Sequence, residues 1–495
     1  MAYTLGIDIG TYETKGVLVD QNGVICAQAA RAHKMLVPQP GWAEHKPEED
    51  WWGDFVYVCR ALLNESKAAP EDIKAVSCSA IGPCMLPIDG DGNPLMNGVL
   101  YGVDGRAEEQ VRDLTQRIGE KTIIARCGNA LTSQSVGPKI LWLKTERPEI
   151  YDQTAHILTS TSFLVQRLTG EVVIDHYTAA NFSPLYDVET LSWTNDLADD
   201  IIDLSKLPRL LWSNEVAGQI TRKAAAETGL AVGTPVTTGT IDAAAEALSV
   251  GVDQPGDMMM MYGSTIFIIL RAQQKVTDPR IWYAPWLFEG EHASMAGLAT
   301  SGTLTHWFRD QLARDLDSKE AFPFLANEAE QSPPGANGLL MLPYFSGERT
   351  PIHDIHAKGV FFGLNLTHTR GDMYRALIEG IAHGTRHVTD TFAELGQSPK
   401  RLLAVGGGTK NALWLQSTSD ITGIDQVVSE KTTGASYGDA FLAALALGWV
   451  ERSDIPQWNP SLQTITAKPD ERLEKAHHLF RRLYEQTKDI AADLG

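Results

Sequence analysis

Tyr3-Thr-Leu-Gly-Ile-Asp-Ile-Gly-Thr-Tyr-Glu-Thr-Lys15 begins the chain with a strand, a Gly-Thr turn and the start of a second strand. Apolar residues of the first strand alternate toward one face, which leaves Asp8 on the other face beside the turn. Residues 16–20 return, and Asn22-Gly23 favours a tight hairpin before a third strand. Backbone N–H groups and hydroxyls of such a turn can bind an anion, and a nearby carboxylate can orient hydrated Mg²⁺. The pattern therefore predicts a triphosphate site; an ordinary edge hairpin is the alternative.

The composition describes a large, acidic and globular protein. Its 495 residues suit two to four domains, and 43% apolar residues suffice for large packed cores. Lys and Arg total 42 against 62 Asp and Glu, and the formal charge of -20 argues against nucleic acid as a partner. The most apolar run, 258–270, is too short to cross a bilayer, so no membrane partner is expected. Five scattered cysteines, without a Cys-x-x-Cys pair or a secretory signal before them, predict a reduced cytoplasmic location.

Strands and helices alternate along the chain, which predicts an α/β architecture with partly parallel sheets. We expect helices at 47–63, 107–118, 243–249, 372–395 and 436–447, and strands at 73–77 and 402–405. Residues 257–270 repeat the opening order of strand, Gly-Ser-Thr turn and strand. This layout predicts a second domain on the plan of the first, with domains 1–249 and 250–495; an accidental hairpin is the alternative.

Asp242 stands where a predicted strand meets an Ala-rich helix. Side chains at the carboxyl end of a strand project into a cleft, and a carboxylate there could accept the proton of an alcohol that attacks phosphorus. The alternative is an N-cap for the helix. Capping is the commoner use of Asp in such places, so the residues alone favour the cap.

Two glycine-rich turns offer further places where a backbone can approach a ligand closely. They are Gly263-Ser-Thr265 and Gly406-Gly-Gly-Thr-Lys-Asn411, and glycine lacks the Cβ that would block a phosphate or a purine. Gly302 could lie against an adenine or simply begin a helix. Each signal alone is more often a tight turn than a nucleotide site. The histidines lack metal-ligand spacing on one helix, which disfavours a zinc site.

A longer series of motifs runs through almost the whole chain. The motifs are Asp8-x-Gly-Thr-x-x-Thr-Lys15, Pro40-Gly-Trp-x-Glu44, Asp104-Gly-Arg106, Lys139-Ile-Leu-Trp142, Arg167-Leu-Thr-Gly170, Gly239-Thr-Ile-Asp242, Gly263-Ser-Thr265, Leu342-Pro-Tyr-Phe-Ser-Gly-Glu-Arg-Thr-Pro351, residues 359–379 and Gly406-Gly-Gly408. In order and spacing, this series resembles the FGGY carbohydrate kinases of the actin-like ATPase superfamily.

The resemblance implies two actin-like (ribonuclease H-like) ATPase domains of α/β class with a catalytic cleft between them. It implies ATP-dependent phosphorylation of a sugar or polyol hydroxyl, with Asp242 as catalytic base in contact with the substrate and Asp8 holding Mg²⁺ through water. The implied substrate contacts are Ser79, Ile81, Gly82, Asp104 and Arg106. The implied contacts with ATP are Gly10, Thr11, Thr14, Lys15, Gly263, Ser264, Thr265, Gly302, Gly407, Gly408 and Asn411.

Within the family, the Gly406-Gly-Gly408 turn followed by Leu413-Trp-Leu-Gln416 looks more like the xylulose kinases than the glycerol kinases. The first expectation is therefore a kinase that converts D-xylulose to D-xylulose 5-phosphate. The chain departs from the xylulose kinase pattern in the Ser79–Cys84 loop, where Ile81 and Pro83 replace Gln and His. A tryptophan usual before the substrate aspartate is also replaced, by Gly102.

Two other functions stay open at this point. One is a kinase for another small polyol or ketose, such as glycerol, a tetritol or ribulose. The other is a sugar and ATP sensor without catalysis, although Asp8, Lys15 and Asp242 together speak against it. Whether the chain forms a homodimer is also open.

Overall fold

The computed structural model describes residues 2–317 and 320–494, and the chain forms two compact units. The first unit consists of Met1–Asp253, Gln274–Ala293 and Thr433–Pro460. The second consists of Gln254–Gln273, Ser294–Thr432 and Ser461–Gly495. The expected boundary between residues 249 and 250 stays a prediction for the family domains. By packing, the first unit also contains two later segments.

The opening hairpin lies inside the sheet of the first unit, whose strand order is β13-β14-β5-β1-β2-β3, with β15 also paired to β5. β1 pairs antiparallel with β2 and parallel with β5, so the interpretation as an edge hairpin is wrong. The strands are β1 (Tyr3–Ile9), β2 (Glu13–Asp20), β3 (Ile25–Ala32), β5 (Ile73–Ala80), β13 (Val216–Gln219), β14 (Pro235–Thr237) and β15 (Thr240–Ile241).

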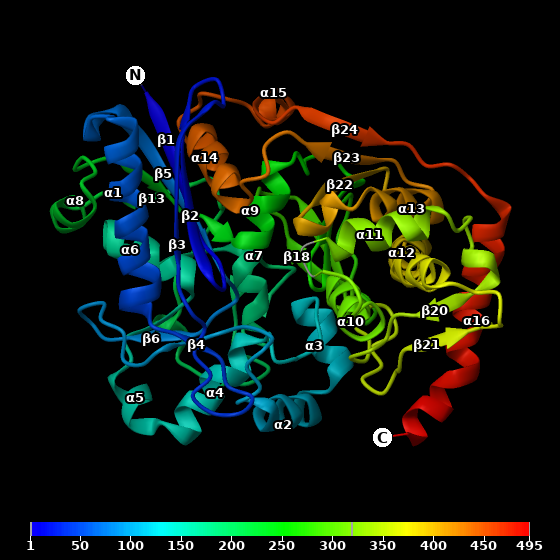
Figure 1. The fold of residues 1–495 in the computed structure, drawn as a ribbon. Coiled ribbons are helices and arrows are strands. Elements are labelled where there is room, and N and C mark those ends of the chain that lie inside the picture. Colours follow the sequence, from blue (N-terminus) through cyan, green and yellow to red (C-terminus); the bar gives the residue numbers. More distant parts are fainter. Residues whose placement is uncertain (1, 318–319, 495) are drawn as a thin grey trace. The chain divides into compact units, whose positions relative to one another are not determined.

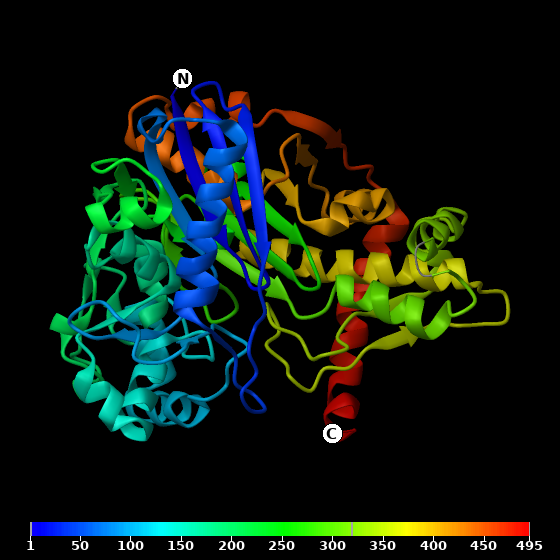
Figure 2. The same cartoon turned by 60° about the vertical axis from the view of Figure 1, so that its left-hand side comes forward.

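The helix α1 (Asp54–Ser66) covers one face of this sheet, across β2 and β3 (Figure 2). Its buried residues Phe55, Val58, Cys59 and Leu62 recur at helical spacing and form one apolar stripe. The helix expected at 47–63 begins instead with a wider π-helical turn at Pro47–Gly53, in which two adjacent tryptophans are both buried.

The other elements of the first unit are mostly short. The helices are α2 (Glu108–Ile118), α3 (Glu120–Cys127), α4 (Val136–Glu146), α5 (Pro148–Gln153), α6 (Ser160–Thr169), α7 (His176–Ala179), α8 (Arg222–Thr228), α9 (Asp242–Ser249), α14 (Ala435–Ala446) and α15 (Ile455–Trp458). The strands are β4 (Glu44–His45), β6 (Leu86–Ile88), β7 (Gly98–Val99), β8 (His156–Leu158), β9 (Val173–Asp175), β10 (Tyr186–Asp187), β11 (Ser192–Trp193), β12 (Arg209–Leu211) and β18 (Trp282–Pro285).

The helix α14 comes from the last segment of the first unit and packs against β1, β5 and α9 (Figure 1). Two glycines make this contact unusually close. A Cβ at Gly6 would lie 2.0 Å from the carbonyl oxygen of Ser436, and one at Gly438 would lie 1.9 Å from that of Ala245. Since real side chains never come so near, α14 can lie here because both positions are glycine.

The sheet of the second unit repeats the plan of the first, as expected. Its strands follow the order β19-β17-β16-β22-β23-β24, and β16 pairs antiparallel with β17 and parallel with β22. These strands are β16 (Asp257–Tyr262), β17 (Ile266–Ala272), β19 (His292–Leu298), β22 (Arg401–Val405), β23 (Gln426–Ser429) and β24 (Ser461–Ile465), with β20 (Leu340–Leu342) and β21 (Val360–Phe362) as a separate pair. The helices are α10 (Gly302–Leu312), α11 (Ala321–Glu330), α12 (Arg370–Glu394), α13 (Ala412–Thr422) and α16 (Glu471–Asp493).

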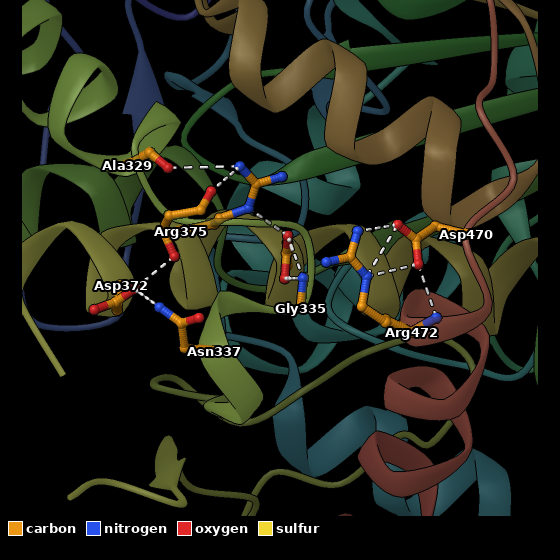
Figure 3. Close-up of polar contacts among 9 residues, drawn as sticks. Ala329, Gly335, Asn337, Asp372, Arg375, Asp470 and Arg472 are labelled. Atoms are coloured by element: carbon orange, nitrogen blue, oxygen red, sulfur yellow. Dashed lines mark hydrogen bonds and ion pairs between the residues drawn. The ribbon is translucent and has the colours of Figure 1, made fainter. Parts of the chain in front are cut away.

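A buried ionic network fixes α12 to the loop at residues 332–338, which is rich in Pro and Gly (Figure 3). Arg375 Nε donates to Glu379 Oε1 at 2.7 Å, and the N–H of Gly335 donates to both oxygens of Glu379 at 3.1 Å. Asp372 accepts a hydrogen bond from Asn337 Nδ2 at 2.8 Å and forms a capping box at the start of the helix. The network therefore holds one side of α12 against its loop.

The expected helices at 107–118, 243–249, 372–395 and 436–447 are confirmed as α2, α9, α12 and α14, with ends that differ by one or two residues. Within 2–317 and 320–494, every helix is too short or too polar to span a membrane.

Candidate active site

Four acidic residues of the first unit form a group that we call the carboxyl cluster: Asp8, Asp242, Glu246 and Asp439. Asp8 lies near the end of β1, opposite Lys15 of β2 and Ser79 of β5. Since β1, β5 and β15 run parallel, their carboxyl ends meet at one edge of the sheet. Asp242 follows β15 directly and therefore belongs to the same edge.

Asp242 is the first residue of α9, and Ile241 occupies the N-cap position. The Oδ1 atom of Asp242 accepts the N–H of the adjacent Ala243 at 2.7 Å, which is not a capping bond to the second or third amide. The interpretation of Asp242 as an N-cap is therefore wrong. Glu246 follows one turn later on the same face of the helix.

Asp439 of α14 joins the cluster through Ser79. The Ser79 hydroxyl lies 2.7 Å from Asp439 Oδ2 and 3.1 Å from Asp8 Oδ1. Both Ser79 and Asp439 are fully buried. The hydroxyl predicted to contact a sugar thus links two carboxyl groups of the protein.

Burial disfavours the charged form of all four acids. It raises the pKa of Asp8 to about 7, and the charge of Glu246 adds to the rise while Lys15 opposes it. Burial and the charge of Asp8 raise the pKa values of Asp242 and Asp439 well above the ordinary value of an Asp carboxyl group. Burial also raises the pKa of Glu246. Such a cluster favours a proton or a cation among its members.

The donor set suits Mg²⁺ that arrives with phosphates. No group of three or more acidic, His or Cys side chains in 2–317 and 320–494 is arranged to hold a metal ion by itself. Mg²⁺ prefers oxygen ligands, keeps several waters and usually binds one or two carboxylates together with substrate phosphates. Asp8 and its neighbours offer that kind of partial site.

The turn after β1 is held on its protein side by a second network of hydrogen bonds. His33 bridges the carbonyl oxygen of Gly10, at 3.0 Å, and Asp54 Oδ2, at 2.9 Å. Thr14 is fully buried and donates to the same Asp54 oxygen at 3.2 Å, so its side chain braces the turn from the protein side. The Lys15 side chain, in contrast, is 52% exposed and can meet a ligand.

Asp104 and Arg106 form a buried ion pair. Asp104 Oδ2 accepts the N–H of Ala43 at 2.7 Å and Arg106 Nη2 at 2.8 Å, and Asp104 is fully buried. The same guanidinium bonds to Glu44 at 2.8 Å and stacks on Trp42 at 3.9 Å. Its Nη1 atom is buried without a hydrogen-bond partner in the described part of the chain. Arg106 thus supports this loop and retains one unused donor.

The loop that begins at Ser79 turns its side chains inward. Ile81 is fully buried, and its N–H donates to the carbonyl oxygen of Ile9 at 2.7 Å. A Cβ at Gly82 would lie 2.9 Å from Ile241 Cγ1, so the glycine permits close packing. With Ser79 and Ile81 buried, a ligand would meet this loop through Gly82.

A pocket of about 680 Å³ lies within the second unit. Six of the seven residues predicted there line it, from three separate turns: Gly263, Ser264, Gly302, Gly407, Gly408 and Asn411. Thr265 is not among its lining residues. The remaining wall includes the rings of Phe322, Tyr374 and Trp414. A pocket with flat apolar walls beside exposed backbone suits a nucleotide.

The start of α10 is fastened to the turn after β16. The N–H of Gly302 donates to the carbonyl oxygen of Gly263 at 3.0 Å, and Thr303 Oγ1 donates to that of Ser264 at 2.7 Å. A Cβ at Gly302 would lie 2.5 Å from the Gly263 oxygen. A Cβ at Gly407, in contrast, would meet no atom within 4 Å. Gly302 is therefore needed for packing, while Gly407 faces open space at the pocket.

The residues that sequence reasoning missed are Asp439, Glu246, Tyr374 and Trp414. A lone carboxyl within the apolar helix 435–446 was the available signal for Asp439, and the i, i+4 spacing from Asp242 was the signal for Glu246. Trp414 and Tyr374 belong to segments that the motifs already included. No local pattern separates a ring that lines a pocket from one in a core.

Comparisons with known proteins cover both units. The N-terminal domain of the FGGY family of carbohydrate kinases matches residues 3–249, and its C-terminal domain matches residues 258–447. The xylulose kinase of Bacillus subtilis (strain 168) is 29% identical over 502 residues, which cover 99% of this chain and 98% of the relative.

Two solved structures are similar over the same length. The xylulose kinase from Rhodospirillum rubrum has a TM-score of 0.93 at 30% identity and covers 99% of both chains. The gluconate kinase from Lactobacillus acidophilus has a TM-score of 0.90 at 25% identity and covers 99% of this chain and 98% of that one. Because both family domains match in order along the sequence, the chain belongs to the FGGY family of carbohydrate kinases and is a phosphotransferase with an alcohol group as acceptor.

Proposed function

We propose that this chain transfers the terminal phosphoryl group of ATP to the terminal hydroxyl of D-xylulose, giving D-xylulose 5-phosphate. The observation that carries the proposal is the carboxyl cluster, in which Asp242 stands at a strand end beside Asp8. Two xylulose kinases that are 29% and 30% identical over nearly the whole chain support this acceptor.

Asp242 is the catalytic base in this proposal. It accepts the proton of the acceptor hydroxyl as a new P–O bond forms and the bond to the ADP oxygen breaks. Its raised pKa makes its ionised form a stronger base than an ordinary carboxylate, and Mg²⁺ held by Asp8 would favour that ionised form. Asp8 would hold Mg²⁺ through water, and the bound ion would neutralise charge on the phosphates. Gly10, Thr11 and Lys15 lie beside the transferred group.

The nucleotide binds in the pocket of the second unit. The purine lies between the apolar and aromatic walls, and the backbone of Gly407 and Gly408 approaches its ribose and phosphates. Asn411 caps α13 through its side chain and fixes the end of this turn. ATP and Mg²⁺ are the proposed cofactors.

The sugar meets Arg106, Asp104 and the backbone of Gly82. Arg106 Nη1 is buried and has no hydrogen-bond partner among the described residues, so this loop would have to rearrange before that atom could donate to a sugar oxygen. Asp104 reaches a hydroxyl by exchanging one of its present bonds to Arg106 or Ala43.

D-gluconate is a second candidate acceptor. The gluconate kinase relative supports it, and a buried guanidinium donor without a partner suits a carboxylate. A neutral ketose would use Arg106 only as a hydrogen-bond donor, whereas an anionic aldonate would also use its positive charge.

A coupled assay of ADP release tests these choices over D-xylulose, D-ribulose, glycerol, erythritol and D-gluconate. We expect D-xylulose to give the highest kcat/KM and Asp242→Asn to remain at the water-only background. A D-gluconate kcat/KM above that of D-xylulose would make D-gluconate the first candidate acceptor and D-xylulose the second. ADP release no faster than the water-only background with every acceptor would indicate a nucleotide-binding protein that transfers no phosphoryl group, and would overturn the proposal.

A further inference from the structure

Asp175 is a buried carboxyl group of the first unit that the proposed transfer does not use. It ends β9, occupies the N-cap of α7 and is only 2% exposed. Its Oδ2 atom accepts the N–H of Thr178 at 3.2 Å, the hydroxyl of Thr240 at 2.9 Å and the hydroxyl of Ser213 at 3.3 Å. The bond to Thr240 is the shortest of these three. One carboxyl oxygen therefore joins the start of α7 to two other segments of the chain.

Thr240 is the residue through which this carboxyl group reaches the candidate active site. Thr240 and Ile241 form the whole of β15, and Asp242 follows them directly. Within the described residues, the Asp242 carboxyl group accepts one hydrogen bond, from the N–H of Ala243 at 2.7 Å. Its side chain is thus held by the adjacent backbone. The direction of the Asp242 carboxyl group therefore depends on where β15 places that backbone.

Side-chain contacts at Thr240 matter because β15 is short. It pairs with β5 at two positions, Thr240 and Ile241, so few backbone hydrogen bonds hold it. The Thr161 hydroxyl donates to the carbonyl oxygen of Thr240 at 2.9 Å, while Asp175 accepts the Thr240 hydroxyl. All three of these side chains are buried. Thr161 and Asp175 thus hold Thr240 by its backbone and by its side chain.

The chain is also anchored just before Thr240. The N–H of Gly239 donates to the carbonyl oxygen of Ser213 at 3.1 Å. A Cβ at Gly239 would lie 2.0 Å from the carbonyl oxygen of Cys78, so the backbone there packs closely against β5. Because these backbone contacts fix the preceding residue, loss of the bond between Thr240 and Asp175 would displace the chain on the other side, toward Asp242.

We propose that Asp175 is a positioning residue for phosphoryl transfer: by accepting the Thr240 hydroxyl it fixes the start of β15 and so directs the Asp242 carboxyl group at the acceptor hydroxyl. This inference rests on the proposed role of Asp242 as the base. Asp175 acts through Thr240 and makes no contact of its own with the acceptor. A general base has to lie within hydrogen-bond reach of the proton that it takes, and a misplacement of about 1 Å lowers the rate about a hundredfold.

The test removes the Thr240 hydroxyl while keeping the shape of the side chain. Thr240→Val should lower kcat for ADP release about a hundredfold, with the KM values for ATP and for the acceptor within about twofold of the parent chain. Thr240→Ser keeps the hydroxyl and should restore kcat to within about threefold of the parent chain. An unchanged kcat in Thr240→Val, or a Thr240→Ser variant as slow as Thr240→Val, would overturn the proposal.

Ser213→Ala is the matched control, because it removes another hydroxyl that bonds to the same oxygen of Asp175. It leaves the Ser213 carbonyl group in place on Gly239, so kcat should stay near that of the parent chain. Thermal unfolding of the two variants measures the loss of stability in each. If Asp175 served the fold alone, kcat would follow stability in both variants, and equal losses of kcat would overturn the proposal.

Asp175→Ala and its combination with Thr240→Val complete a double-mutant cycle. The combined variant should be no slower than the slower single variant, because both changes break the same hydrogen bond. Additive losses of kcat would contradict an action through Thr240. Asp175→Ala also loses the N-cap of α7, and if it does not fold, the Thr240 variants decide the question alone.

Crystal structures of the variants separate this inference from the proposed function. In Thr240→Val the Asp242 carboxyl group should lie about 1 Å from its position in the parent chain, whereas in Ser213→Ala it should not move. An unmoved Asp242 in Thr240→Val would refute the inference whatever the activity. ADP release at the water-only background with every acceptor would refute the proposed function instead, while the crystal structures would still decide the role of Asp175.

Discussion

The Asp242 carboxyl group is kept in an environment that favours its protonated form. We expect Asp242→Asn to lower kcat by about a thousandfold, since a positioned general base contributes that order of rate. Single-turnover ADP release at saturating ATP and sugar measures the loss, and a nucleotide titration should give an unchanged affinity. Retention of kcat in this variant would mean that another group takes the proton.

The same substitution should stabilise the fold at alkaline pH. Because the folded pKa of Asp242 is raised, its ionised form costs stability in full above that pKa, and the cost fades as the pH falls toward the ordinary value near 4. Asp242→Asn should therefore raise the unfolding temperature by about 2 °C at pH 8, and by less at pH 6.5 and pH 5. Calorimetry without Mg²⁺ measures this trend. A gain that grows toward acid pH contradicts it.

Gly407 offers a test of the proposed nucleotide pocket with little effect on folding. Its Cβ would meet nothing within 4 Å of the protein, so Gly407→Ala should fold normally while its methyl group fills ligand space. We expect the KM for ATP to rise about tenfold, because one close contact between the backbone and the nucleotide is lost. The KM for the sugar should be unchanged. Gly438→Ala is the contrasting control, because its Cβ would clash with Ala245 and should destabilise the protein. Equal stability losses in the two variants would refute this distinction.

The helix α12 carries both a buried ion pair and the pocket ring Tyr374. Arg375 and Glu379 lie on that helix with nearly buried side chains, while the nearby pair of Arg472 and Asp470 is exposed at the arginine (Figure 3). Removing one partner of a buried pair leaves an uncompensated charge. Arg375→Met should therefore lower the stability of the second unit by about 3 kcal/mol.

Urea unfolding followed by tryptophan fluorescence measures that loss, and Arg472→Met is the matched control. Exposed pairs contribute little, so the control should unfold with the parent chain. We also expect Arg375→Met to weaken ATP binding, because Tyr374 precedes Arg375 directly on the helix. Equal effects of the two substitutions would show that burial does not decide the energy of these pairs.

Sequence patterns predicted elements better than the contacts between them. Alternation and helical spacing indicated β1, α9, α12 and α14, because those signals depend on neighbouring residues. The contact between Asp439 and Ser79 joins residues 360 positions apart, and no local signal states that the chain returns there. The burial of Ser79, Ile81 and Asp104 could not be predicted from the sequence for the same reason. The glycine turns of the pocket were predictable because the local conformation of each turn requires glycine.

At the scale of the whole molecule, the first unit is built from three separate stretches of chain. A fragment of residues 1–249 lacks α14 and would expose the face of β1 and β5 that this helix covers. We expect that fragment to unfold without cooperativity and to bind a hydrophobic dye, as loosely packed states do. Calorimetry and dye fluorescence provide the measurement.

The matched control joins residues 1–253, 274–293 and 433–460 through two flexible linkers. This chain contains every stretch of the first unit, and we expect a cooperative unfolding transition to return. Cooperative unfolding of 1–249 alone would refute the claim that α14 completes this core.

The origin of α14 late in the sequence also sets an order of events during synthesis. Ribosomes add about 5–20 residues each second, so on the order of ten seconds or more separates the emergence of β15 from that of α14. Throughout that interval the nascent first unit has its opening hairpin but lacks Asp439 and the cover of its sheet. Chaperones have a defined window in which to act on this chain, and a product terminated before residue 433 would never acquire the complete carboxyl cluster.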